Sequence, residues 1–84
     1  MNSATDVWAK VLSLMESELT ATAVNTWFDD TVAVQLTDTS FVIYTPSEFK
    51  RDIIRSRYLP AVQKALFELF AANLDVEILT EEEY

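Results

Sequence analysis

The chain has 84 residues, half of them hydrophobic, and a formal net charge of −8, which allows one domain with a small core and disfavours non-specific binding to nucleic acids or anionic membranes. Cysteine, histidine and glycine are all absent. Their absence excludes disulfides, thiol or imidazole catalysis, the common zinc sites and glycine-rich phosphate loops. No apolar run is long enough to span a bilayer, and we expect a cytoplasmic protein that does not bind membranes.

A wide apolar face marks the first predicted helix, which Ser3 or Thr5 can cap. At about 100° per residue its two apolar stripes cover roughly 160° of the surface. The stripes consist of Trp8, Leu12, Met15 and Leu19, and of Val7, Val11 and Leu14. Such a face is typical of a deeply buried helix. Alternatively, Val7, Trp8 and Val11 form an exposed apolar edge for a partner helix.

A second, short helix is predicted over residues 19–28. Thr20 is a plausible cap, and Val24, Trp27 and Phe28 recur at helical spacing as its anchors. We expect Trp27 in the core with its indole N–H near a polar neighbour. The two aspartates at 29 and 30 have no third ligand or base beside them, which favours a solvated turn over a metal site.

Two strands follow. Residues 31–37 alternate strictly and place Val32, Val34 and Leu36 on one face of a half-buried strand. Residues 41–44 are apolar on both faces, which is typical of a central strand. Because the chain has no glycine for a tight two-residue turn, we expect a loop of about three to five residues between the two strands.

The stretch after Pro46 predicts two helices and a last strand. Phe49, Ile53 and Ile54 should face the sheet, and Pro60 should break or kink the helix. The helix after Pro60 has one apolar stripe, and Phe67 lies outside that stripe. Residues 74–80 alternate as a third strand. The stripe of the helix after Pro60 consists of Val62, Ala65, Leu66, Leu69 and Phe70, and the inward positions of the third strand are Leu74, Val76 and Ile78.

These elements give the order α-α-β-β-α-α-β in an α+β fold. A helical crossover joins the second and third strands, so these should be parallel, while the first two pair antiparallel. The prediction is a three-stranded mixed sheet of order 1-2-3 packed against helices. Residues 1–80 form the single domain, and residues 81–84 are an acidic end or the start of a linker.

The sequence contains few residues arranged for catalysis. No nucleophile has a base beside it and no metal-ligand spacing appears, so we expect neither an enzyme nor a cofactor. The one charge feature is a basic cluster of Lys50, Arg51, Arg55 and Arg57. It fits a solvated helix face with local ion pairs, or alternatively a weak contact with single-stranded nucleic acid.

An ordered set of residues resembles a known family. Trp8 with Leu12, the TWF at 26–28, the FVIYTPSEF at 41–49, and Tyr58 with the stripe to Phe70 are together similar to the N-terminal domain of the bacterial replication initiator DnaA. The resemblance implies a KH-like fold and a protein–protein interaction role. In that family the domain self-associates weakly, helps to load the replicative helicase at the origin, and receives regulatory proteins.

The resemblance also implies site residues. Val7, Trp8 and Val11 match the self-association edge. Phe49 and Ser47 match positions that contact helicase and regulators, although packing alone favours a core role for Phe49. Ala23 stands where some members place a helicase-contacting glutamate, and alanine supplies no charge. The alternatives are a KH-like single-stranded nucleic-acid-binding module and a free-standing regulator that mimics this domain.

Overall fold

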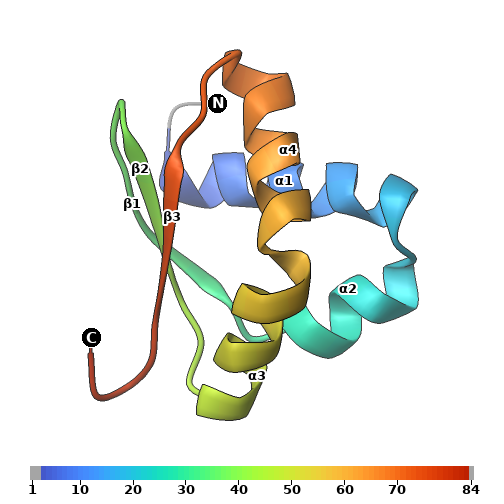
Figure 1. Ribbon diagram of the computed structural model, residues 1–84, viewed down its shortest axis with the longest axis vertical. Helices are drawn as coiled ribbons and strands as arrows, with labels where there is room; N and C mark the ends of the chain where they lie inside the picture. The colour runs from blue at the N-terminus through green and yellow to red at the C-terminus, as the bar shows by residue number, and fades with distance from the viewer. Residues whose placement is uncertain (1–2, 84) are drawn as a thin grey trace.

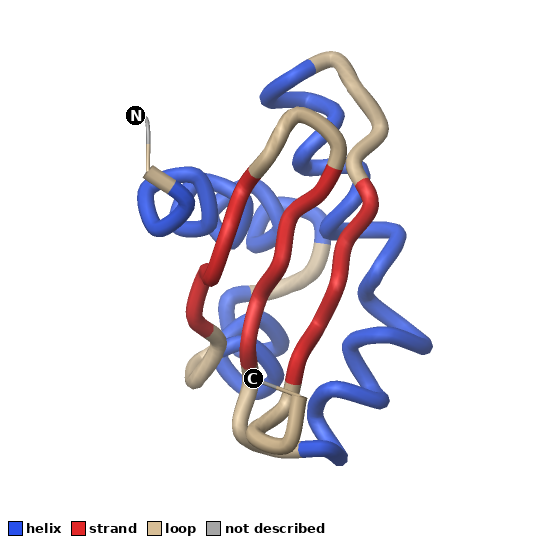
Figure 2. Tube along the Cα trace, turned by 90° about the vertical axis from the view of Figure 1, so that its left-hand side faces the viewer, coloured by secondary structure: helices blue, strands red, loops and turns tan. Residues whose placement is uncertain are grey.

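A computed structural model describes residues 3–83 and confirms the predicted fold class. The chain forms a three-stranded sheet of order β1-β2-β3, in which β1 and β2 are antiparallel and β2 and β3 are parallel. All the helices lie on one face of this sheet, and the other face is open (Figures 1 and 2). The single core therefore lies between the sheet and the helices.

The first two helices begin at the side-chain caps that the sequence indicates. Helix α1 spans Ala4–Glu18, and Ser3 caps it by accepting a hydrogen bond from the backbone N–H of Asp6. Helix α2 spans Ala21–Phe28, and Thr20 caps it in the same way through the N–H of Ala23. These hydroxyls satisfy amides that a helix leaves without an internal partner.

A β-bulge changes the face that the first strand presents. β1 spans Val32–Leu36 and pairs with β2, Ser40–Tyr44, with a register shift between Ala33 and Gln35. Because the bulge adds one residue, Ala33 and Leu36 both pack on the core, and Val32 is exposed. The prediction that Val32, Val34 and Leu36 share one face is therefore wrong, because Leu36 packs on the core and Val32 does not. The β1–β2 loop has three residues, 37–39, as expected.

The helical crossover is continuous through Pro60. Helix α3, Glu48–Ile53, runs into a π-helical turn, η1, at Ile54–Tyr58, and then into α4, Leu59–Phe70. Pro60 lies in the first turn of α4, where the missing N–H costs little. The widened turn changes the direction of the helix without a loop, as Figure 1 shows.

Helix α4 ends at a strained cap, and strand β3, Asp75–Leu79, follows it. Ala71 adopts a left-handed conformation with φ of 54°, a position that glycine usually fills. Leu74 and Ile78 are buried and Val76 packs against the core, as predicted. Phe67 is 48% exposed, as expected for a residue off the stripe, but Phe70 in the last turn is also 43% exposed.

Candidate protein-interaction surface

Phe49 is the most exposed large hydrophobic residue in the described part of the chain, at 67%. Ile54, the first residue of the η1 turn that continues α3, is fully buried and anchors this helical segment to the core. Five residues apart at 100° each, Phe49 lies about 140° around the helix from Ile54. The prediction that Phe49 faces the sheet is therefore wrong, because the helical face that carries Ile54 packs on the core and Phe49 lies on another face.

The Phe49 ring packs against an aromatic residue of α2. Its centroid lies 6.0 Å from that of Trp27, which in turn lies 6.4 Å from Tyr58. Trp27 is only half-buried, so it belongs to the surface as well as to the core. Ala23 precedes Trp27 by four residues and lies on the same side of α2. Ala23, Trp27, Ser47 and Phe49 together define the α2–α3 surface.

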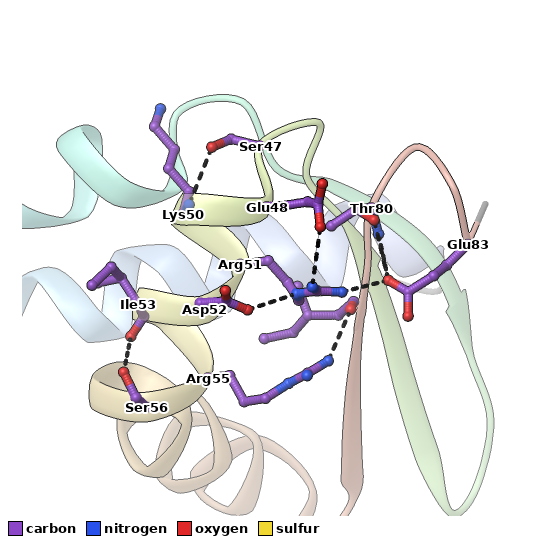
Figure 3. A network of polar contacts seen from close by, with 11 residues as sticks. Ser47, Glu48, Lys50, Arg51, Asp52, Ile53, Arg55, Ser56, Thr80 and Glu83 are labelled. Carbon is purple, nitrogen blue, oxygen red and sulfur yellow. Dashed lines mark hydrogen bonds and ion pairs between the residues drawn. The ribbon is translucent and has the colours of Figure 1, made fainter.

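Ser47 fixes the direction in which α3 starts. Its side chain accepts a hydrogen bond from the backbone N–H of Lys50 at 3.1 Å and caps the helix (Figure 3). A capped first turn holds Phe49 in a defined place. The half-buried hydroxyl therefore has a structural role, whatever partner contacts it makes.

An ion-pair cluster ties the end of α2 to α3. Lys50 Nζ lies 2.9 Å from Asp29 Oδ1 and 3.4 Å from Asp30 Oδ2. The hydrogen bond from Lys50 lowers the pKa of Asp29, and the same bond raises the pKa of Lys50. Asp30 also accepts a hydrogen bond from the buried Thr45 hydroxyl. The two aspartates thus brace the α2–α3 surface rather than forming only a solvated turn.

Arg51 lies at the centre of a second polar network, on the side of α3 that faces the C-terminal turn (Figure 3). Its guanidinium is within ion-pair distance of Glu48, Asp52 and Glu83, and only 15% of its side chain is exposed. Glu83 also accepts hydrogen bonds from the backbone N–H and hydroxyl of Thr80. The acidic end of the described chain is therefore attached to α3.

Three of the four residues of the basic cluster already make ion pairs or hydrogen bonds within the chain. Lys50 and Arg51 are in ion pairs, and Arg55 donates to the backbone oxygen of Ile78 at 3.4 Å. Among the described residues, no hydrogen-bond or ion-pair partner exists for Arg57. To bind a phosphate, Lys50 and Arg51 would have to release their carboxylate partners, which disfavours a nucleic-acid contact through these two residues.

The predicted exposed edge of α1 is wrong. Val7, Trp8 and Val11 are 2%, 5% and 0% exposed. The Trp8 ring packs between Phe28 and Phe41, and its indole N–H donates to the Thr31 hydroxyl at 2.9 Å. The wide apolar face is covered because α1 contacts β1, α2 and α4 at once, although Leu12, Leu14 and Leu19 on it are only half-buried. The alternative of a deeply buried helix is the correct one.

Within residues 3–83 no group of three or more acidic residues is placed to hold a metal ion. None of the helices described there has the length and hydropathy needed to cross a membrane. What distinguishes the surface is its exposed aromatic residues. Sequence reasoning missed Trp27 as a surface residue, although its spacing of four from Ala23 was a usable signal.

The fold and this surface define a class of protein: an α+β domain with a three-stranded mixed sheet, whose conspicuous site is an aromatic surface on two adjacent helices. The model of one family, described as the DnaA N-terminal domain, matches residues 5–68. The chain therefore belongs to the DnaA N-terminal domain family.

Curated relatives agree with that assignment. The chain is 27% identical over 77 residues to the chromosomal replication initiator protein DnaA of Caldanaerobacter subterraneus subsp. tengcongensis. It is 29% identical over 77 residues to the proteins of the same name from Thermoanaerobacter sp. and Thermoanaerobacter pseudethanolicus. Each alignment covers 92% of this chain but only 17% of the relative.

Proposed function

We propose that the chain is a non-catalytic interaction domain that acts in the cytoplasm in DNA replication initiation and docks partner proteins through the α2–α3 surface. The proposed partners are the replicative helicase and initiation regulators. The observation that carries the proposal is the exposure of Phe49, which is 67% accessible on a capped helix and packs against Trp27. Exposed aromatic residues on a rigid support are typical anchors of protein interfaces.

The arrangement around Phe49 suits docking. The Ser47 cap and the pairing of Lys50 with Asp29 and Asp30 fix α3 relative to α2. A partner therefore does not have to order these helices when it binds, which reduces the entropic cost of association. Ala23 gives the α2 side of the surface a small apolar residue, so the contact there is proposed to be apolar rather than ionic.

Self-association through α1 is not part of the proposal, because Val7, Trp8 and Val11 are buried. Any weak homo-oligomer would have to use another surface. No cofactor is proposed for the domain. The nucleic-acid-binding alternative has little support, since Lys50, Arg51 and Arg55 are engaged within the chain.

The direct test measures binding of the domain to the replicative helicase of the same organism by biolayer interferometry. Loss of a central aromatic anchor costs about 2 kcal/mol or more, so Phe49→Ala should weaken binding by roughly 30-fold. Phe67→Ala is the matched control, because Phe67 is 48% exposed but lies on α4. If both variants bind as tightly as the unchanged domain, the proposal is wrong.

A further inference from the structure

A hollow lies at the end of the molecule opposite the α2–α3 surface. It has a volume of about 380 Å³ and lies between the β1–β2 loop and the connection from α4 to β3. Both views place these two segments at the same end, away from α3 and the C-terminal turn (Figures 1 and 2). Its volume falls within the range of roughly 300–1,000 Å³ that is common for small-ligand pockets.

The lining is mainly apolar. Leu36, Phe70, Ala72 and Leu74 line the hollow together with Thr37 and Asp38. Leu74 is buried and Leu36 half-buried, whereas Phe70 remains 43% exposed in the last turn of α4. A hollow with an apolar lining and an exposed phenylalanine at its side can accept an apolar side chain of a partner.

Hydrogen bonds hold the walls of the hollow in place. The Thr37 hydroxyl accepts from the backbone N–H of Ser40 at 3.0 Å and of Thr39 at 3.3 Å. The backbone N–H of Asp75 donates to the Thr39 oxygen at 2.9 Å. The loop and the start of β3 are thus joined, so the hollow exists before any partner binds.

The segments that build the hollow carry negatively charged side chains and no positively charged ones. Residues 11–49 and 65–84, which include both segments that build it, contain no lysine or arginine. Asp38 is the one charged residue among those that line the hollow, and α4 has no basic residue in its last turn. The carbonyl end of the helix adds negative potential. A cation at this rim therefore finds the Asp38 carboxylate and no competing lysine or arginine from these segments.

We propose that this hollow is a second docking site, for a segment of a partner protein that presents an apolar side chain followed by a basic one. The apolar side chain enters between Phe70 and Leu36, and the cation lies against Asp38. Charge complementarity selects this occupant over an acidic segment. The site is independent of the α2–α3 surface, so the domain can hold two partners at its two ends.

The test is an NMR titration of the ¹⁵N-labelled chain with the dipeptide N-acetyl-phenylalanyl-arginine amide. We expect saturable shifts of the amides of residues 36–38 and 70–74. N-acetyl-phenylalanyl-glutamate amide should bind at least about three-fold more weakly, because its second side chain is an anion that Asp38 repels. Absence of shifts at these amides, or equal binding of the two dipeptides, would overturn the proposal.

Three variants test whether the dipeptide binds in the hollow or elsewhere on the surface. Phe70→Ala should weaken binding about ten-fold, whereas Phe67→Ala, similarly exposed on the same helix but outside the lining, should leave it unchanged. Ala72→Arg places bulk and positive charge at the exposed rim without touching the core, and should abolish binding. If Phe67→Ala is as harmful as Phe70→Ala, or if Ala72→Arg binds normally, the dipeptide does not occupy this hollow and the proposal fails.

Discussion

Replacing Trp8 tests whether α1 serves the core or a partner. Trp8 is 5% exposed, and its ring centroid lies 6.0 Å from that of Phe28 and 5.6 Å from that of Phe41. Truncating a buried aromatic side chain to alanine costs about 3–5 kcal/mol. A domain of this size has a free energy of unfolding of roughly 4–13 kcal/mol. Trp8→Ala should therefore remove a large share of the total stability.

A milder variant isolates the hydrogen bond. Trp8→Phe keeps an aromatic ring between the same neighbours but loses the indole N–H that donates to Thr31. The Thr31 hydroxyl still donates to the Phe28 oxygen at 2.7 Å, so it is not left without a partner. We expect a loss of about 1–2 kcal/mol from the hydrogen bond and the reduced ring volume.

Urea unfolding followed by circular dichroism measures both effects. With an m-value of about 1 kcal/mol/M, the midpoint should fall by roughly 3 M or more for Trp8→Ala and by roughly 1–2 M for Trp8→Phe. Sedimentation at several concentrations runs alongside. If Trp8→Ala keeps the original urea midpoint and changes only self-association, Trp8 lies at an interface and the burial argument is refuted.

Three further predictions concern the α4 cap, the C-terminal turn and the basic cluster. Ala71→Gly relieves the left-handed alanine and should stabilise the domain by about 1 kcal/mol in urea unfolding, whereas Ala72→Gly, which has no positive φ, should not; equal effects would contradict the strain argument. Hydrogen bonds from Thr80, with Arg51 nearby, hold the pKa of Glu83 below its ordinary 4.5, so the stability it adds is present above pH 4.5 and is lost as the pH falls through the lowered value. Glu83→Gln should flatten that loss in acid unfolding curves and Glu82→Gln should not; identical curves for the two variants would refute it. Oligo-dT should bind more weakly than roughly 100 µM by fluorescence anisotropy in moderate salt; micromolar binding with a steep salt dependence would show that the cluster is a nucleic-acid site after all.

The fold was predictable because each element carries its own signal. The caps at Ser3 and Thr20 mark the starts of α1 and α2. The two-sided apolar run of β2 and the helical crossover determine the order and direction of the strands. The bulge in β1 was not predictable, because strict alternation gives no sign of an extra residue. The π-helical turn before Pro60 likewise leaves the apolar spacing intact.

The surface was harder to predict than the core. Periodicity alone does not tell how many faces of α1 are covered, and three packing partners bury what looked like a surplus edge. Phe49 was assigned to the buried face together with Ile53 and Ile54, but of these three only Ile54 is buried. Only the family resemblance pointed to Phe49 as a contact residue. The pairing of Lys50 with two aspartates is a long-range contact that the sequence pattern does not reveal.

The two tryptophans provide the most direct test of the α2–α3 surface. The indole N–H of Trp8 is buried and hydrogen-bonded, whereas Trp27 is half-buried and packs against Phe49. In an NMR titration of the labelled chain with the replicative helicase, the Trp27 indole signal should shift or broaden first, and the Trp8 signal should persist until the whole spectrum broadens. A selective change at Trp8 with Trp27 unaffected would contradict the proposed docking surface.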